Sequence, residues 1–268
     1  MNRSKRLILT TVCLALALIG AQDVRAQNSE LPGTMKQVVM TLPDADGFVL
    51  HMVDTPVPEI AEDEILVEVR AAALNGYDWR VRARLRDGDI TQLGQEQIPT
   101  LYDVSGVVVA AGASVDAFEV GDEVMAYNGA AFAQYTAGKA ETFAPKPELV
   151  SHETAASLPV AGICALHSLH GIADIQAGQT VLIHGGAGGV GHFAIQIAKN
   201  RGAVVYTTVS ADDIPFVRAL GADHIIDYRA ERFEDVVPPV DVVMEIIGGE
   251  VRERSLKVAK PDGMFITY

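Results

Sequence analysis

The chain has 268 residues, of which 49% are hydrophobic and 21% charged, and it contains two cysteines. Intrinsic disorder needs low hydrophobicity and a disulfide scaffold needs many cysteines, so the composition excludes both classes. The formal net charge of −14 provides no positive surface for nucleic-acid phosphates or anionic lipids. The length allows one large domain or two smaller ones.

Residues 1–26 have the pattern of a secretory signal peptide. A basic start ending at Arg6 precedes an apolar or hydroxyl-bearing run, Leu7 to Ile19, which is too short to span a bilayer comfortably. Small residues favour cleavage after Ala26, which would remove four positive charges and one negative charge and change −14 to −17. The mature chain would keep one cysteine, Cys164, and could form no internal disulfide.

This leader predicts export to the periplasm or the medium, with no stable membrane insertion after cleavage. A membrane-anchoring or core helix is the alternative for the apolar run, and an internal start at Met35 would give a cytoplasmic form. Residues 27–34 are expected to be a spacer.

Residues 35–150 are predicted to form a β-barrel or a strongly bent sheet. Short β-rich runs are separated there by proline, glycine and aspartate, which break strands. The expected strands are 36–40, 48–54, 65–72, 104–111 and a strand entered from the turn at Gly121, 123–125.

Residues 151–268 alternate strands and helices, which predicts an α/β unit with a doubly wound parallel sheet. Strands are expected at 180–184, 204–208, 224–227, 241–247 and 264–267, and helices at 190–200, 214–220 and 252–259. The helix 190–200 carries an apolar stripe with helical spacing, and Gly202 stands where a C-terminal cap is expected.

A glycine-rich turn from His184 to Gly191 follows the first strand of this half. Gly186, Gly188 and Gly191 satisfy the G-x-G-x-x-G pattern between an apolar strand and an amphipathic helix. Glycine permits a tight turn and a close approach of pyrophosphate, and the helix N-terminus offers free N–H groups. The context predicts dinucleotide binding rather than a purely structural turn.

The preference between NADP and NAD depends on the end of the next strand. No acidic residue stands there to hold the ribose 2′-hydroxyl of NAD, and Ser210 could bond a 2′-phosphate, which favours NADP with NAD as the alternative. Asp212 and Asp213 would repel that phosphate if they faced it, or else they cap the next helix. Arg229 and Arg232 are either candidates for the missing positive charge or solvated surface residues.

Several motifs in order resemble the zinc-independent quinone oxidoreductase (zeta-crystallin-like) group of the medium-chain dehydrogenase/reductase superfamily. The resemblance runs from Met35 to Tyr268 and includes an N-x-x-D segment at Asn75 to Asp78. The other matching stretches are 35–39, 105–108, 120–124, 144–147, 155–162, 183–191, 220–223 and 226–228.

This resemblance implies a GroES-like β-barrel substrate domain at 35–150 and a Rossmann domain at 151–268. It implies hydride transfer from NADPH to a small-molecule quinone or α,β-unsaturated carbonyl without a metal, and homodimers are usual in the family. The mature chain offers no clustered cysteine and histidine ligands for zinc. Family members generally continue beyond the strand 264–267, so the Rossmann sheet is expected to be incomplete.

The resemblance also implies which residues form the site. Asn75 and Asp78 are expected near the nicotinamide and substrate, with Tyr77 or Tyr127 as candidate proton donors. Cofactor contacts are expected from Pro159, Ala161, Cys164, Gly186, Gly188, Gly189, Val190, Gly191, Ser210, Tyr228, Ile247 and Gly248. Two departures from the family pattern stand out: Cys164 replaces a common threonine, and the lysine often found after the second strand is absent.

An exported, non-catalytic relative that binds a dinucleotide or another small molecule is the alternative function. Export favours it, because reduced nicotinamide cofactors are expected in the cytosol, and so do the missing lysine and the short C-terminus. The glycine motif together with Asn75 and Asp78 favours the enzyme.

Overall fold

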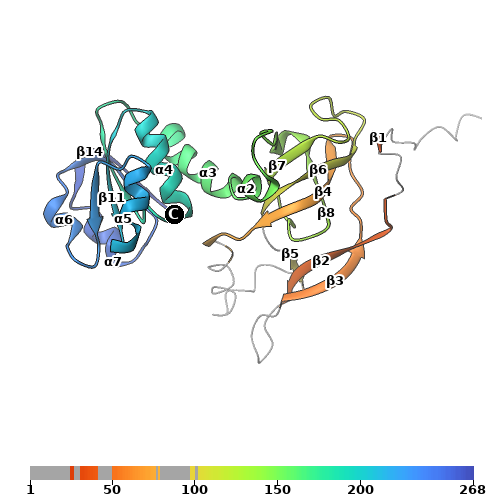
Figure 1. Ribbon diagram of the computed structural model, residues 1–268, viewed down its shortest axis with the longest axis horizontal. Helices are drawn as coiled ribbons and strands as arrows, with labels where there is room; N and C mark the ends of the chain where they lie inside the picture. Colours follow the sequence, from red (N-terminus) through yellow and green to blue (C-terminus); the bar gives the residue numbers. More distant parts are fainter. Residues whose placement is uncertain (1–24, 27–30, 42–49, 77, 79–96, 100–101) are drawn as a thin grey trace, which may run out of the picture.

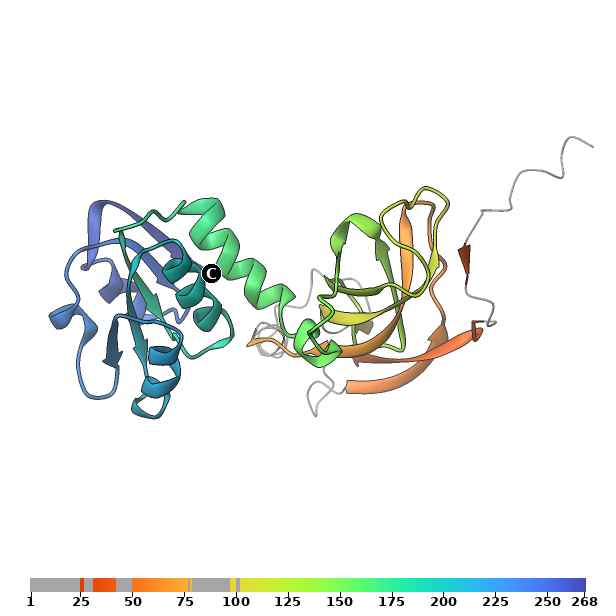
Figure 2. The ribbon, with the colours of Figure 1, turned by 45° about the horizontal axis from the view of Figure 1, so that its top comes forward.

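The computed structural model describes residues 25–26, 31–41, 50–76, 78, 97–99 and 102–268. Most of the predicted leader and the candidate proton donor Tyr77 lie outside these ranges. Two units stand at opposite ends of the molecule, with helices α2 and α3 between them (Figures 1 and 2). Within the described ranges, every helix is too short or too polar to cross a bilayer.

The N-terminal unit is built from two antiparallel sheets. One has the order β8-β4-β6-β7-β9, with β1 beside β6, and the other has the order β3-β2-β5. Their bounds are β1 Arg25–Ala26, β2 Thr34–Thr41, β3 Leu50–Pro56, β4 Glu64–Ala73, β5 Gln97–Pro99, β6 Asp103–Ala111, β7 Glu123–Tyr127, β8 Tyr135–Lys139 and β9 Phe143–Pro145. A short 3₁₀ turn, η2 (Ala140–Thr142), precedes β9. The expected bent-sheet architecture is confirmed.

Strands β4 and β6 form the centre of this unit because their apolar side chains are buried together. Ile65 and Val67 on β4 pack with Val104 and Val108 on β6. Gly106 is required where β6 pairs with β4, since a Cβ there would collide with the carbonyl oxygen of Glu68. The side chains of Asp103 and Ser105 are also buried on β6, which leaves polar groups to be satisfied inside the protein.

Two helices follow the barrel. Helix α2 (His152–Ala156) begins at Ser151, whose hydroxyl accepts a hydrogen bond from the Thr154 amide at 3.2 Å. Helix α3 (Pro159–Leu166) begins with a proline in its first turn and continues into a π-helical segment, η3 (His167–Ile172). The chain then enters the second unit.

The C-terminal unit contains a parallel sheet with the order β12-β11-β10-β13-β14. Its elements are β10 Thr180–His184, α4 Gly189–Asn200, β11 Val204–Val209, η4 Ala211–Asp213, α5 Ile214–Ala219, β12 His224–Asp227, α6 Phe233–Val236, β13 Val240–Glu245, α7 Glu250–Ser255 and β14 Ala259–Thr267. The expected doubly wound sheet is confirmed.

Alternate residues of the parallel strands pack on opposite faces of this sheet. Val181 and Ile183 contact the cluster that contains Ile195 of α4 and Val217 of α5. Leu182, between them, joins the cluster that contains Phe233 of α6. Because both faces are covered by helices, consecutive residues of the central strand β10, Val181, Leu182 and Ile183, are all apolar and fully buried.

Two expected boundaries were wrong. Helix α7 ends at Ser255, not at residue 259, because the chain turns there and Ala259 already pairs with Val240 in the sheet. Strand β13 ends at Glu245, not at residue 247, because the Glu245 carboxylate accepts the amides of Ile247 and Gly248 and folds them into a turn. Strand β14 is correspondingly longer than expected and contains a register shift opposite Val240 to Val242.

Candidate functional site

The turn between β10 and α4 needs glycine at several positions for packing. Gly185 has a φ of +65°, a backbone conformation that favours glycine. A Cβ on Gly186 would collide with the Thr207 hydroxyl and stand 3.0 Å from Ile195 Cδ1. A Cβ on Gly191 would collide with the Gly185 carbonyl oxygen. These glycines let the turn and helix α4 pack closely on the sheet.

Gly189 has open space instead, whereas a side chain on Gly188 would press on the backbone. The nearest atom to a Cβ on Gly188 would be the Gly185 oxygen at 3.2 Å, and to one on Gly189 the Ala161 Cβ at 4.0 Å. No side chain caps helix α4, and its first intrahelical bond runs from the His192 amide to the Gly188 carbonyl at 3.1 Å. The amides of residues 189–191 therefore precede the hydrogen-bond ladder and are free to hold an anion.

One of the predicted amide donors has a partner inside the turn. The Gly188 N–H donates to the Gly185 carbonyl at 2.9 Å, whereas the predicted donors at Gly189 and Val190 remain at the open helix end. A bound pyrophosphate fits this cradle, since it needs several aligned amides and no Cβ in its path.

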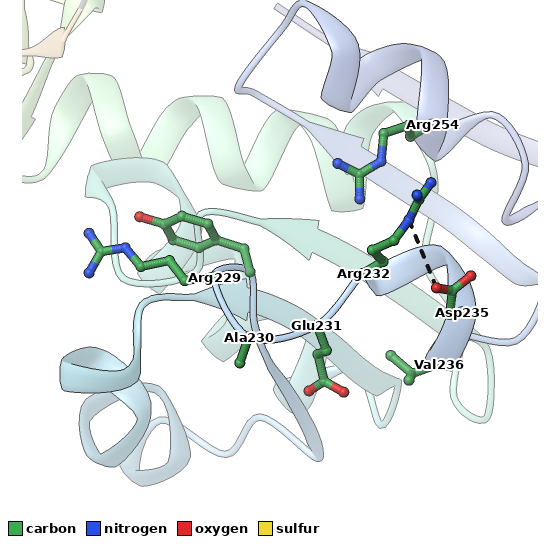
Figure 3. Close-up of a pocket in the computed structure, with 8 residues that line it drawn as sticks. Arg229, Ala230, Glu231, Arg232, Asp235, Val236 and Arg254 are labelled. Carbon is green, nitrogen blue, oxygen red and sulfur yellow. Dashed lines mark ion pairs between the residues drawn. The ribbon is translucent and has the colours of Figure 1, made fainter.

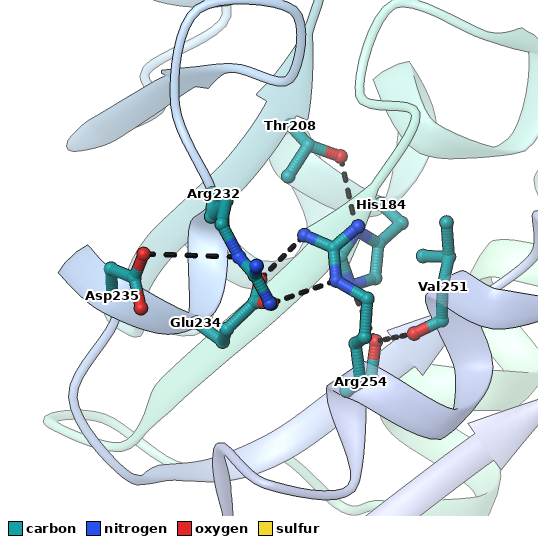
Figure 4. Close-up of polar contacts among 8 residues, drawn as sticks. His184, Thr208, Arg232, Glu234, Asp235, Val251 and Arg254 are labelled. Carbon is teal, nitrogen blue, oxygen red and sulfur yellow. Dashed lines mark hydrogen bonds and ion pairs between the residues drawn. The ribbon is translucent and has the colours of Figure 1, made fainter.

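A buried histidine, His184, supports the glycine turn through a hydrogen bond with Thr208 (Figure 4). His184 Nδ1 lies 3.0 Å from Thr208 Oγ1, and its Nε2 lies 2.9 Å from Ser255 Oγ. Ser255 donates its own proton to the Val251 carbonyl, so His184 Nε2 carries the ring proton and Nδ1 accepts from Thr208. Burial disfavours the imidazolium and lowers the pKa of His184 to about 4.

Thr208 links this histidine to the glycine turn. Its Oγ1 accepts the Gly185 amide at 3.2 Å, and its carbonyl accepts the Gly186 amide at 3.1 Å. The neutral state of His184 therefore supports the backbone that leads into helix α4.

The N-x-x-D segment after β4 forms a closed turn. The Asp78 amide donates to the Asn75 carbonyl at 3.1 Å, and Asp78 Oδ2 accepts the Asn75 amide at 2.7 Å. The Asn75 side chain donates from Nδ2 to Asp103 Oδ2 at 2.8 Å. Burial raises the pKa of Asp78, against the lowering effect of the Asn75 amide. Asp78 thus shapes the turn that carries Asn75.

Helix α3 contributes residues beside the glycine turn. Pro159 and Ala161 are buried, and Ala161 Cβ faces the open space at Gly189. Burial, with the nearby Asp103 charge, raises the pKa of the half-buried Cys164 thiol. A thiol whose pKa is raised is a poor nucleophile, so Cys164 acts here as a small neutral side chain.

The turn after β13 borders the same region. Ile247 is exposed, and its Cδ1 would stand 3.2 Å from a Cβ on Gly185. Gly248 has a φ of +85°, and both amides of this turn bond to one oxygen of the buried Glu245, at 2.6 and 2.7 Å. Arg252 pairs with the other carboxylate oxygen at 3.3 Å. Sequence reasoning missed Glu245, although an acid ending an apolar strand was a visible signal.

Ser210 directly follows the carboxyl end of strand β11, and Tyr228 directly follows that of strand β12. The Ser210 hydroxyl donates to Asp213 Oδ2 at 2.6 Å, so its proton is directed to a carboxylate. Asp213 makes no side-chain cap to α5. Tyr228 is exposed, and the Arg229 guanidinium lies over its ring at 5.4 Å.

Tyr228 and Arg229 line a cavity of about 440 Å³ (Figure 3), and Ser210 is not among its lining residues. Arg232, on its other side, pairs with Glu234 at 2.6 Å and with Asp235 at 3.8 Å. In the described part of the chain no carboxylate forms an ion pair with the Arg229 guanidinium, although Asp227 accepts its backbone amide at 3.0 Å, so Arg229 is the better of the two predicted arginines for an anion.

The structure therefore brings residues 161, 185–191 and 247 together, and it joins Asn75 to α3 through Asp103. Tyr127 is the cross-strand partner of Asp103 in the β6–β7 pair, and its ring stacks on Tyr102 with ring centroids 5.1 Å apart. Asp103 was not among the predicted site residues, because its two partners lie far away in the sequence.

Two family models match the chain. The alcohol dehydrogenase GroES-like domain matches residues 61–165, and the zinc-binding dehydrogenase model matches residues 189–268. Among curated proteins, the chloroplastic quinone-oxidoreductase homolog of Spinacia oleracea is 35% identical over 71% of this chain and 60% of its own length. The chloroplastic NADPH-dependent alkenal/one oxidoreductase of Arabidopsis thaliana is 38% identical over 78% of this chain and 56% of its own.

Solved structures give the same assignment. The quinone oxidoreductase from Coxiella burnetii is 36% identical and has a TM-score of 0.75, with 87% of this chain and 75% of that chain covered. A mycobacterial relative complexed with NADPH is 29% identical, with a TM-score of 0.77 and coverage of 87% and 74%. The chain spans 56 to 60% of the length of the first curated relatives. It belongs to the medium-chain dehydrogenase/reductase superfamily, in the quinone oxidoreductase and alkenal reductase group.

Proposed function

We propose that this chain is a zinc-independent reductase that uses NADPH to reduce a small quinone or an α,β-unsaturated carbonyl compound. The observation that carries the proposal is the uncapped N-terminus of helix α4 with the open Gly189 at its first residue. The names of the relatives support the substrate class, since they include a quinone oxidoreductase and an alkenal/one oxidoreductase.

When bound, the nicotinamide cofactor supplies the hydride. The chain's own residues bind the cofactor and orient the reactants. The amides of Gly189 and Val190 hold the pyrophosphate, and Ala161 and Ile247 flank the space beside the turn. Asn75 presents its carboxamide from the barrel. This division of labour relies on orientation of the reactants more than on a reactive side chain.

The absence of zinc is part of the proposal. In the ranges that the structure describes, histidine, cysteine, aspartate and glutamate form no group of three that could ligate a metal ion. A catalytic zinc needs three such ligands. We therefore expect full activity in the presence of a strong chelator.

The preference for NADPH is the finer part of the proposal. Arg229 and the exposed Tyr228 can face a 2′-phosphate, while the carboxylate of Asp213, bonded to Ser210, opposes it. The relative complexed with NADPH supports this preference. NADH is the competing cofactor.

Turnover tests the proposal. The purified chain is incubated with NADPH or NADH and either a benzoquinone or an alkenal, with and without EDTA, and the loss of cofactor absorbance is followed. We expect oxidation of NADPH that EDTA does not change. Saturable binding without turnover of any acceptor would favour the non-catalytic binding protein, and NADH oxidised faster than NADPH would reverse the cofactor preference.

Export remains a proposal of its own. If the leader is cleaved after Ala26, the protein recovered from the periplasm or medium should begin at Gln27. N-terminal sequencing of the secreted protein tests this, and a cytoplasmic protein that begins at Met35 would contradict it.

A further inference from the structure

Asp103 is a fully buried carboxylate at the first position of strand β6. Its Oδ1 accepts the backbone amide of Val160 at 2.8 Å, and its Oδ2 accepts Nδ2 of Asn75 at 2.8 Å. Val160 belongs to the first turn of helix α3. One barrel side chain thus joins two parts of the proposed site that lie far apart in the sequence.

The contact with Asp103 determines which way the Asn75 amide is turned. An ionised carboxylate only accepts hydrogen bonds, so the NH₂ group of Asn75 faces it and Oδ1 points away. The Asn75 backbone is held separately, because Asp78 accepts its amide. Both the position and the orientation of the Asn75 side chain are therefore fixed before any ligand binds.

The contact with Val160 places a negative charge at the start of a helix. Helix α3 has no side-chain cap of its own, and Pro159 has no N–H to offer. A carboxylate at a helix N-terminus is favourable because it accepts a free amide and complements the helix dipole. Asp103 therefore fixes the first turn of α3, which leads to Ala161 beside the glycine turn.

We propose that Asp103 is a positioning residue, which orients Asn75 and anchors α3 so that both receive the nicotinamide half of the dinucleotide. This inference rests on the proposed function, since it assumes that a nicotinamide dinucleotide binds at the α4 turn. It predicts that loss of Asp103 weakens binding of the nicotinamide half of the ligand and leaves binding of the adenosine half unchanged.

Ser105 provides a matched control two residues along the same strand. It is equally buried, and its Oγ donates to the Val124 carbonyl at 2.8 Å and lies 2.8 Å from His152 Nδ1 of helix α2. His152 in turn lies 3.2 Å from Glu123. Ser105 therefore also ties a helix to the barrel, but it has no bond to Asn75.

The test compares Asp103→Asn with Ser105→Ala in the full chain. Calorimetric titration measures the dissociation constants of NADPH and of 2′,5′-ADP, which is the adenosine half alone. For Asp103→Asn we expect NADPH affinity to fall about tenfold or more and 2′,5′-ADP affinity to stay within about twofold. For Ser105→Ala we expect both affinities to stay within about twofold.

A double-mutant cycle completes the test. If Asp103 acts largely through Asn75, adding Asn75→Ala to Asp103→Asn should cost much less than Asn75→Ala alone. If Asp103→Asn lacks a cooperative melt, Asp103→Ser replaces it with the same expected pattern. Equal losses for both ligands, the same losses in Ser105→Ala, or additive effects would overturn the inference. A wild-type chain that binds neither ligand would overturn the proposed function as well.

Discussion

Helices α3 and α4 begin beside each other but treat their first turns in opposite ways. A buried carboxylate from the barrel, Asp103, accepts an amide of the first turn of α3. Helix α4 has no side-chain cap, and Gly189 at its start leaves open space. Both helices have the same requirement, because the first amides of any helix lack intrahelical partners. Helix α3 gives one of these amides a partner within the protein, whereas helix α4 leaves its first amides available to a ligand.

Residue choice explains this difference. Helix α3 starts with Pro159, which removes one donor and fixes the backbone, and a carboxylate oxygen of Asp103 accepts the next amide, that of Val160. Helix α4 starts with glycines, which keep the donors and remove the side chains that would cover them. A free helix start framed by glycine is therefore more informative about function than a free helix start alone.

Gly191→Ala should have the largest effect, because it disrupts the glycine turn that leads into helix α4. The new Cβ would collide with the Gly185 carbonyl oxygen and stand 2.8 Å from Gly186 Cα, and both are backbone atoms that cannot rotate away. We expect a loss of about 3 kcal/mol or more in the free energy of unfolding and no NADPH binding. Urea denaturation and titration measure the two effects.

The control is Gly162→Ala on helix α3. A Cβ there meets nothing within 4 Å, so the variant should be as stable as the wild type or about 0.5–1 kcal/mol more stable. Wild-type stability and binding in Gly191→Ala would show that the turn tolerates a side chain and would contradict the packing argument.

Acid should lower the free energy of unfolding through His184, which supports the glycine turn before helix α4. Its pKa is about 4 in the folded protein and about 6.5 when unfolded. Between these values the unfolded chain binds a proton that the folded chain does not, so this contribution falls as pH drops from about 6.5 to about 4. The loss is on the order of 3 kcal/mol.

Replacement of this histidine should flatten that pH dependence. His184→Gln cannot take up a proton, so its free energy of unfolding should be lower at neutral pH but less sensitive to acid, as measured by urea denaturation at several pH values. The partly exposed His192 of helix α4 is the control, and His192→Gln should keep the wild-type slope. An unchanged slope in His184→Gln would rule out this residue as the source.

The smallest expected effect is a change in cofactor preference at Ser210 and Asp213, after strand β11. Asp213→Asn removes the charge that Ser210 contacts and should raise the NADPH-to-NADH affinity ratio by about threefold, a typical size for a charge that solvent partly screens. Asp262→Asn, on exposed β14, should leave the ratio unchanged. Titration of both variants with both cofactors measures it, and a lower ratio in Asp213→Asn would mean that this carboxylate does not face the 2′-phosphate.

The glycine turn could be predicted from sequence because its signals are local. Strand β10 and the start of α4 follow from an apolar run, a glycine pattern and helical spacing within a few residues. The fold class could be predicted for the same reason. The extent of β14 could not, since Pro261 and Gly263 read as a break and only pairing with β13 keeps them in the strand.

The polar support of the site could not be predicted, because it depends on contacts between distant residues. Asp103 meets Val160, 57 positions away, and Asn75, 28 positions away. The partner of Ser210 was equally hidden, although Asp213 is close in sequence, because the 3₁₀ turn η4 decides where its carboxylate points. The roles assigned to Asn75, Asp78, Ser210 and Tyr228 stay predictions.

Titration of the wild type and Gly189→Ala with NADPH tests the central claim most directly. A Cβ on Gly189 would stand 4.0 Å from its nearest neighbour, so alanine fits the protein and fills the space reserved for the pyrophosphate. We predict that Gly189→Ala keeps or raises the melting temperature and weakens NADPH binding about tenfold or more. Wild-type affinity in this variant would contradict the claim that the open start of α4 is the dinucleotide site.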